Sequence, residues 1–189
     1  MSVNKHLWKP GTMVYPVPVV MVSCGDQPEN YNIITIAWTG TICSEPAMTY
    51  ISVRPERHSY DIIKRTGEFV INLTNKKLAF ATDYCGVKSG RDIKKFQKMK
   101  LTPVPGEHVK APIIKESPLN IECQVVEIKS LGSHDMFLAK VVGIQADTEY
   151  INKKGGFELQ KTEPICYSHG RYYLLGRDLG HFGFSVKKR

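Results

Sequence analysis

Six short runs of strand-forming residues, separated by glycine, proline and aspartate, constrain this fold more than any other feature. The runs are rich in Val, Ile and Thr, and several alternate apolar with polar residues. Such runs favour extended chain, and the residues between them favour turns. The predicted strands span residues 17–23, 32–38, 48–53, 68–73, 120–130 and 136–147. The last two flank the sequence Gly-Ser-His-Asp at 132–135, which predicts a long antiparallel hairpin.

Three helical windows interrupt the strands, at residues 59–66, 76–84 and 92–99. They are too short and too irregularly spaced for a repeating βαβ pattern. A mainly β fold is therefore expected, in which a closed or sandwiched antiparallel sheet carries a few short helices over its ends. The 189 residues contain no internal repeat or low-complexity linker, which predicts a single domain over residues 1–189.

The distribution of apolar residues and cysteines argues against several protein classes. No apolar run approaches the roughly 20 residues that span a bilayer, and the first sixteen residues lack the apolar core of a signal peptide. Five cysteines are scattered singly, with no Cys and His at zinc-site spacing. Reduced thiols, a cytoplasmic location, no membrane partner and no metal site are the expectations.

The net charge of +8 comes largely from residues 88–100 and the C-terminal Lys-Lys-Arg. It fits a solvated helix face with a frayed terminus, and it fits equally an anionic partner. Nucleic acid is the weaker choice of partner, because Phe96 stands alone among these charges and no nucleic-acid-binding motif is present. The dinucleotide and phosphate-loop glycine motifs and the common hydrolase motifs are also missing from the sequence.

Two segments could bind an anion. In the first, Arg54 and Pro55 lead out of a strand, Ser59 is expected to cap the following helix, and Gly67 is expected to end it. Free backbone N–H groups beside Arg54, Arg57 and His58 would suit a phosphate. An ordinary strand–turn–helix with solvated arginines fits the same residues.

In the second segment, Ser89, Gly90 and Asp92 precede a basic helix, and Gly86 and Gly90 permit a close backbone approach. A capped helix facing solvent is the alternative. Between residues 32 and 55 an apolar run becomes small and polar, so its backbone could reach the rim of a flat ligand. Trp38 would then form a wall against that ligand, or it is plain core.

Taken in order, several segments resemble one known family, the flavin reductase-like proteins with an FMN-binding split barrel, particularly the flavoredoxin and archaeal ferric-reductase branch. The segments are YNIITIAWTGTICSEPAMTYISVRPERHSYDII, GEFVINL, CGVKSGRDIKKF, ESPLNIECQVVEIKSLGSHDMFLAKV and YSHGRYYLLG. They cover nearly the whole chain. The resemblance implies an antiparallel Greek-key split β-barrel and a homodimer with FMN near the subunit boundary.

The resemblance also implies which residues contact the flavin. Those beside the ring, through their backbone, are Thr35, Ile36, Ala37, Trp38 and Thr39. Those at the ribityl chain and phosphate are Ser52, Val53 and Arg54, with His58 and Ser59 closing on the phosphate. Those of a further phosphate-side or ring-side patch are Ser89, Gly90 and Lys95, with Arg91 a weaker match.

Cys43 and His134 match positions near the reactive face of the flavin in this family. For Cys43 a packed thiol is an equal alternative to a redox or metal-contacting role. For His134 the alternative is a hydrogen-bonded turn residue, and the chain reads Gly-Ser-His where the family usually has Gly-Asp/Asn-His or Gly-x-His.

The resulting hypothesis is an FMN-binding oxidoreductase that NADH or NADPH reduces, with free flavin, a ferric chelate, oxygen or a protein as acceptor. In such an enzyme the protein supplies position and electrostatics while the flavin supplies the chemistry. The rival is a flavoprotein electron carrier that takes electrons from a redox partner protein docked on its basic surface. Nucleic-acid binding, which rests on the charge alone, is the third interpretation.

Overall fold

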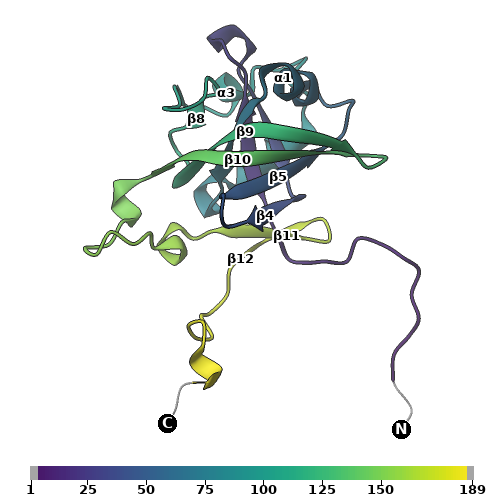
Figure 1. Cartoon of the computed structure of the whole chain (residues 1–189), viewed down its shortest axis with the longest axis vertical. Coiled ribbons are helices and arrows are strands. Elements are labelled where there is room, and N and C mark those ends of the chain that lie inside the picture. Colours follow the sequence, from purple (N-terminus) through teal and green to yellow (C-terminus); the bar gives the residue numbers. More distant parts are fainter. Residues whose placement is uncertain (1–3, 187–189) are drawn as a thin grey trace.

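The computed structural model describes residues 4–186, and its main feature is a curled, seven-stranded antiparallel sheet (Figure 1). The strand order is β3-β2-β6-β9-β10-β5-β4. The strands are β2 (Val20–Cys24), β3 (Asn32–Ile36), β4 (Thr39–Cys43), β5 (Met48–Val53), β6 (Glu68–Leu73), β9 (Leu119–Ser130) and β10 (Asp135–Ala146).

Two small sheets and three α-helices complete the architecture. A three-stranded sheet has the order β1-β11-β12 and lies beneath the β4 edge in Figure 1, and a two-stranded sheet pairs β7 with β8. Their strands are β1 (Val17–Pro18), β11 (Ile165–Ser168), β12 (Arg171–Leu174), β7 (Pro103–Val104) and β8 (Ile113–Ile114). The helices are α1 (His58–Thr66), α2 (Ala79–Val87) and α3 (Lys95–Lys98), with 3₁₀ turns at Pro28–Asn30, Lys76–Leu78, Thr148–Tyr150, Leu159–Thr162 and Phe184–Val186.

The predicted hairpin is confirmed as the pair β9 and β10. Its antiparallel register runs from Ser130 opposite Asp135 to Leu119 opposite Ala146, with two irregularities near Ala139 and Gly143. The first half of β9 is largely buried, whereas its second half is exposed. Residues 126–130 of β9 lie beyond its pairing with β6, whereas residues 135–140 of β10 still pair with β5, and the turn at residues 131–134 ends the hairpin.

The central strands are buried on both faces, which explains their continuous apolar sequences. Val20 and Val22 pack into a cluster with Ile63 of α1, whereas Met21 packs into a second cluster with Ala81 of α2. Successive side chains of a strand point to opposite faces, so helices cover β2 on both sides. A run without polar alternation is the expected sequence for such a strand.

Helix α1 ends as predicted but begins differently. Gly67 adopts a left-handed conformation with φ of 69°, and its N–H donates to the Ile63 carbonyl at 2.8 Å. The prediction of Ser59 as N-cap is wrong, because Arg57 occupies the cap and Ser59 lies inside the first turn. Ser59 is buried and its hydroxyl accepts a hydrogen bond from Asn32 Nδ2, so it serves a contact with β3 instead.

Other predicted elements also need correction. The predicted strand 17–23 is two strands in different sheets, because Val17 and Pro18 pair with β11. Strands β4, β11 and β12 were not expected as separate elements. The predicted helix 76–84 is a 3₁₀ turn followed by α2, and the predicted helix 92–99 is reduced to the four residues of α3. Within residues 4–186 no helix is long and apolar enough to cross a membrane, and all five cysteines are free.

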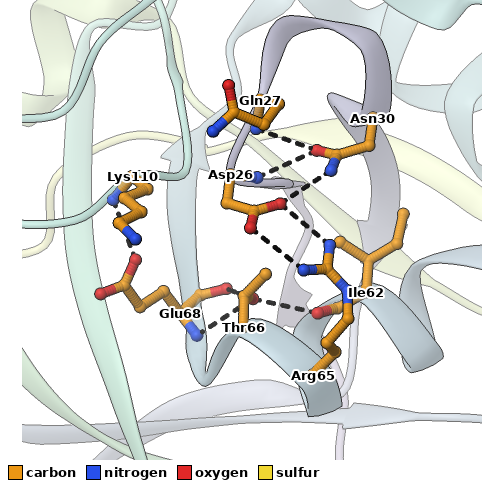
Figure 2. Close-up of polar contacts among 8 residues, drawn as sticks. All are labelled: Asp26, Gln27, Asn30, Ile62, Arg65, Thr66, Glu68 and Lys110. Atoms are coloured by element: carbon orange, nitrogen blue, oxygen red, sulfur yellow. Dashed lines mark hydrogen bonds and ion pairs between the residues drawn. The ribbon is translucent and has the colours of Figure 1, made fainter.

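An ion pair fixes α1 against the turn between β2 and β3 (Figure 2). The Arg65 guanidinium donates to both Asp26 carboxylate oxygens, at 3.0 and 2.9 Å. Asn30 donates a further bond to Asp26 at 2.7 Å. The bonds from Arg65 and then from Asn30 lower the pKa of the Asp26 carboxyl. The pair is exposed, so its role is to orient the last turn of α1 rather than to add much stability.

Candidate functional site

A cleft opens beside β3, between α2 and the end of β5. It consists of a large cavity of about 510 Å³ and a small cavity of about 240 Å³. Ile34, Arg57 and Gly86 line both cavities, so the two adjoin. The cleft therefore has room for a ligand with one broad part and one compact part.

Strand β3 and the corner after it form the inner wall of the large cavity. The Thr35 hydroxyl donates to the Thr82 carbonyl of α2 at 2.5 Å, and Ser52 N donates to the Trp38 carbonyl at 2.9 Å. A Cβ on Gly86 would lie 3.2 Å from the Thr35 Cβ, so this glycine lets α2 pack closely on β3. These contacts hold the wall in place from two sides.

Four aromatic side chains stand around the large cavity. Tyr15 lies 6.1 Å from Trp38 and 6.3 Å from Tyr167 between ring centroids, and Tyr167 lies 5.8 Å from Tyr172. Tyr172 Oη donates to an Asp83 carboxylate oxygen at 3.0 Å, which links β12 to α2. Burial and this hydrogen bond raise the pKa of Tyr172 to about 12. The large cavity is thus framed by apolar ring faces that suit a flat ligand.

His134 reaches the large cavity from the hairpin turn. Its Nδ1 lies 2.9 Å from the Ser133 hydroxyl. Partial burial, and after it the charge of Arg54, lowers the pKa of His134. The imidazole is therefore neutral near pH 7 and can donate from one ring nitrogen and accept at the other.

The position of this turn is fixed by the buried carboxylate of Asp135. It accepts hydrogen bonds from Tyr60 Oη at 2.6 Å and from Ser130 Oγ at 2.7 Å. These bonds, that of Tyr60 first, lower the pKa of the Asp135 carboxyl. Because Tyr60 belongs to α1, the turn that carries His134 is attached to the helix whose first turn lines the small cavity.

The small cavity is built around the first turn of α1. His58 and Ser59 line it, and the first N–H groups of a helix have no partner within the helix. Asn32 Nδ2 donates to Ser59 Oγ at 2.8 Å, and both side chains are buried. A Cβ on Gly90 would overlap the Asn32 side chain, so the loop can approach only with glycine at this position. The sequence suggested that the backbone at Gly90 approaches a neighbour closely, and that neighbour is the side chain of Asn32.

Lys95 is a nearly buried cation that lines the small cavity, with 4% of its surface exposed. Its Nζ donates to the Ile33 and Cys85 carbonyls, both at 2.7 Å. Burial lowers the pKa of Lys95. An ammonium group has three N–H donors, so one remains for a ligand.

Other cations gather at the same cavity. Arg91 Nη1 donates to the Glu56 carbonyl at 3.0 Å, which ties its loop to the residues before α1. Arg57 and Lys88 also line the cavity, and Glu56 is the one carboxylate residue that does. Burial, and after it Arg91 and Lys95, lowers the pKa of His58 because its cationic form is repelled. An excess of cations beside helix N–H groups is the arrangement that binds phosphate.

The cleft brings together most of the residues that the sequence singled out. In the large cavity these are Thr35, Ile36, Ala37, Trp38, Ser52, Val53, Arg54 and His134. In the small cavity these are His58, Ser59, Ser89, Gly90 and Lys95. Arg54 therefore lies on the broad side of the cleft, and Arg57 rather than Arg54 borders both parts.

Thr39 and Cys43 do not line either cavity. The buried Thr39 hydroxyl donates to the Tyr50 carbonyl at 2.5 Å, which secures the pairing of β4 with β5. The Cys43 thiol donates to the Glu45 carbonyl at 3.4 Å. Among residues 4–186 no three His, Cys, Asp or Glu side chains gather as a metal site would require. The geometry gives no support to a redox or metal role for Cys43.

Sequence reasoning missed the aromatic wall and its anchor. Tyr15, Tyr167 and Tyr172 come from segments far from β3 in the sequence, and Asp83 comes from α2. A usable signal was the segment Tyr-Ser-His-Gly-Arg-Tyr-Tyr-Leu, in which a glycine turn separates two short tyrosine-bearing runs. The pairing of β11 with β12 around Gly170 places these tyrosines at the cleft.

Comparisons with known proteins agree with this geometry. Residues 12–176 match the model of the flavin reductase like domain family. Flavoredoxin of Desulfovibrio vulgaris is 30% identical, with a TM-score of 0.90 that covers 97% of this chain and all of that one. A putative flavin reductase with a split barrel domain from Shewanella frigidimarina has 22% identity and a TM-score of 0.78, covering 88% and 85% of the two chains.

A relative with no assigned activity extends the comparison to archaea. An uncharacterized protein of Pyrococcus abyssi is 32% identical over 77% of this chain and 80% of its own length. The close match in fold to the flavoredoxin, together with the curled antiparallel sheet, confirms the predicted split-barrel fold.

Proposed function

The chain belongs to the flavin reductase-like domain family, and on that premise we propose that it is an FMN-binding oxidoreductase reduced by NADH or NADPH. The observation that carries the proposal is the two-part cleft. FMN has a broad, flat ring system and a compact phosphate, joined by a flexible ribityl chain. The cleft offers a broad aromatic-walled cavity that adjoins a small cationic one.

The donor groups in the small cavity fit a phosphate dianion. His58 and Ser59 of the first turn of α1 line this space, as do Arg57 and Lys95, and the Lys95 ammonium keeps one N–H beyond its two carbonyl bonds. Hydrogen bonds to charged groups contribute about 1.5–3 kcal/mol each. Residues His58, Ser59, Ser89 and Gly90 would complete the phosphate site, as the resemblance implies.

The large cavity would hold the ring. The backbone from Thr35 to Trp38 would run along the ring edge, with Ser52 and Val53 at the ribityl chain. Backbone N–H groups near the ring would stabilise negative charge that develops there on reduction. When bound, FMN supplies the exchange of one or two electrons that the side chains of this protein cannot perform.

The protein contributes alignment and exclusion of water. The neutral imidazole of His134 would position the nicotinamide donor at the open side of the cavity through a hydrogen bond. The tyrosines would shield the ring from solvent. Hydride delivery itself needs no acid or base from the protein, which agrees with a large cavity whose carboxylate, Asp83, is already bonded to Tyr172.

The test is the absorbance of the purified protein, followed by anaerobic mixing. We expect flavin bands in the holo-protein, and bleaching within minutes by NADH, NADPH or both. If neither donor bleaches the flavin while dithionite does, the reductase assignment fails. If no flavin binds at all, the cofactor assignment fails as well.

The second candidate is an electron carrier that accepts electrons from a protein. It is favoured by the 30% identity to a flavoredoxin and by exposed cations on the segment that lines the small cavity, among them Lys88, Arg91, Lys94 and Lys98. An acidic redox partner could dock there. The same mixing experiment decides, because a carrier of this kind is reduced by dithionite but not by nicotinamides.

We also propose a homodimer. The described ends of the chain project from the body of the protein (Figure 1), and they carry strongly exposed apolar side chains. Leu7 and Trp8 are 94% and 71% exposed, and Leu179 and Phe182 are at least 88% exposed. A second copy of the chain would cover them. Sedimentation of the holo-protein at micromolar concentration should give the dimer mass, and a monomer would refute the proposal.

A further inference from the structure

The outward side of α2 carries large apolar side chains that remain exposed in residues 4–186. Phe80 and Val87 are 76% and 67% exposed. The Phe80 ring stacks on the Tyr84 ring, with 6.4 Å between the ring centroids. The three residues are spaced by four and three positions, so they share one side of the helix. A row of exposed apolar side chains of this kind marks a surface that contacts another molecule.

An open hollow of about 570 Å³ between α2 and α3 continues this side of the helix. Tyr84 borders the hollow from α2, and Ile93 and Lys98 are among the residues that border it from the α3 segment. A side chain of a docked molecule could enter the hollow beside the stacked rings. Phe80, Tyr84, Val87 and this hollow together form the α2 face.

Positive charge is concentrated around the α2 face. Residues 76–100 contain eight Lys and Arg residues and two Asp residues, so this segment accounts for a net charge of +6 out of the +8 of the whole chain. Lys76 pairs with Glu163 and Lys95 is buried, and the other six cations are exposed, at Lys77, Lys88, Arg91, Lys94, Lys98 and Lys100. An apolar centre with a basic rim is complementary to an acidic protein surface that has its own apolar centre.

The α2 face lies next to the large cavity. Val87 belongs to the α2 face and also lines that cavity, as do Asp83 and Gly86 of the same helix. Helix α2 is bonded to β3 through Thr35 and Thr82. One helix, about 10 Å across, therefore separates the α2 face from the wall proposed to hold the flavin ring. Electrons pass between proteins only where their redox centres come close together, and a partner on the α2 face meets that condition.

A single-stranded nucleic acid would also use cations and aromatic side chains. However, the aliphatic Val87 offers a base no ring on which to stack. A nucleic acid at this place would also cover the edge of a redox site without exchanging electrons with it. A protein partner accounts both for the apolar centre and for its position beside the cleft.

We propose that the α2 face is the docking site of an acidic redox protein that exchanges single electrons with the flavin. The inference rests on the proposed function, because it takes the large cavity as the site of the flavin ring. Since α2 stands between the partner and the ring, a hydride cannot pass, and the electrons cross one at a time. Each reduced partner loses one electron and is oxidised. Two encounters supply two electrons, and two protons from solvent complete the reduction of one flavin.

The probe is a reduced plant-type [2Fe–2S] ferredoxin, a small acidic protein, mixed anaerobically with the FMN-loaded protein. Lys98→Glu reverses one charge of the rim. At low ionic strength this variant should slow reduction of the flavin about tenfold or more, because complementary charge raises association rates by orders of magnitude. The difference should shrink near 1 M salt, where the Debye length is about 3 Å.

A second variant, Phe80→Ser, removes the exposed ring and leaves the charges in place. It should slow reduction by ferredoxin about tenfold at low and at high salt, since the loss of one aromatic contact does not depend on screening. The matched controls are Lys129→Glu and Val126→Ser on the exposed half of β9, which should leave the rate unchanged. None of these four residues lines the large or the small cavity, so FMN affinity and bleaching by NADH should match wild type in all four variants.

The proposal is overturned if ferredoxin fails to reduce the flavin of the wild-type protein, or reduces it equally fast in wild type, Lys98→Glu and Phe80→Ser. Either result leaves the FMN assignment intact, because flavin absorbance and bleaching by dithionite are separate readouts. If Phe80→Ser loses binding of a single-stranded oligonucleotide and keeps the wild-type ferredoxin rate, the α2 face binds nucleic acid and the proposal is wrong. If no FMN binds to the wild-type protein, the proposed function fails and the docking site fails with it.

Discussion

The two ends of the cleft are built in opposite ways. The small cavity is formed by residues between Asn32 and Lys95, and several of its polar side chains are buried and hydrogen-bonded, as in Asn32–Ser59 and Lys95. The outer wall of the large cavity comes from Tyr15, Tyr167 and Tyr172, which lie near the two ends of the chain. These rings are in contact with one another but remain partly exposed.

We interpret the two cavities as having different roles: the small cavity holds one charged group in place, and the large cavity lets reactants enter and leave. Buried, satisfied polar groups are costly to rearrange, so the small cavity is preorganised for one charged group. Aromatic side chains on short strands adjust more easily, because few buried contacts restrain them. A cofactor anchored by its phosphate can then stay in place while reactants enter and leave at the ring.

The largest effect is expected where the small cavity is tightest. Gly90→Ala would place a Cβ onto Asn32 and force that buried side chain away from Ser59. Such overpacking costs about 1–3 kcal/mol, and the displaced loop should lower FMN affinity by about a hundredfold. Flavin fluorescence titration measures the affinity, and circular dichroism checks the fold.

The control for this variant is Gly176→Ala, where an added Cβ meets no atom within 4 Å. It should bind FMN like wild type. If Gly90→Ala binds FMN normally, the small cavity is not rigid, and the proposed difference in rigidity between the two cavities is wrong.

At the ring end, His134→Ala should slow reduction of the bound flavin by the nicotinamide. Misplacement of reacting groups by about 1 Å can cost on the order of a hundredfold in rate. FMN affinity should not change, because the phosphate site is at the other end. Stopped-flow absorbance under argon gives the rate, and Lys129→Ala on the exposed half of β9 serves as the control. A wild-type rate in His134→Ala would remove His134 from the positioning role.

A third prediction concerns the boundary between the two ends. Arg54→Ala should weaken FMN binding about ten- to a hundredfold and leave riboflavin binding unchanged, if Arg54 reaches the phosphate. Because Arg57 borders both cavities, Arg57→Ala should have at least as large an effect on FMN. Lys129→Ala on the exposed half of β9 is the control. Equal loss for FMN and riboflavin would assign Arg54 to the ring instead.

The smallest effect should come from Tyr172→Phe, which removes the hydrogen bond to Asp83. The loss should be about 1 kcal/mol or less, or a few degrees in Tm. The pKa of Tyr172 is raised to about 12, so its stabilising contribution is complete below pH 10 and is lost as the pH rises towards 12. Thermal melts between pH 9 and 12 should show this loss in wild type and a smaller one in Tyr172→Phe.

Local patterns predicted the parts of the fold that local chemistry determines. The β9–β10 hairpin and the end of α1 at Gly67 follow from strand periodicity and a glycine cap. The start of α1 was misplaced because a buried contact between Ser59 and Asn32 outweighed the preference of serine for the cap. Residues 92–94 do not join α3. In this segment the Lys94 ammonium donates a hydrogen bond to the carbonyl of Glu29, which is distant in the sequence.

The sequence singled out those cleft residues that adjoin strands with a recognisable pattern. It did not single out those that come from segments distant in the sequence. Ser52, His58 and Lys95, which the sequence singled out, line the cleft. Tyr15 and Tyr172 reach it through the pairings of β1 with β11 and of β11 with β12, which single-sequence periodicity cannot assign. Cys43 follows β3 closely in sequence, yet it stands at the end of β4 and lines neither cavity.

The hydrogen bond from Tyr60 to Asp135 has a consequence for the order in which ligands act. It joins the turn of His134 to the helix whose first turn lines the small cavity, so the two ends of the cleft are connected through α1. Coupling between two binding events is reciprocal in free energy. If a phosphate bound in the small cavity improves the binding of a donor at His134, the bound donor improves the binding of the phosphate by the same factor. The affinity for the cofactor would then be highest while the electron donor is bound.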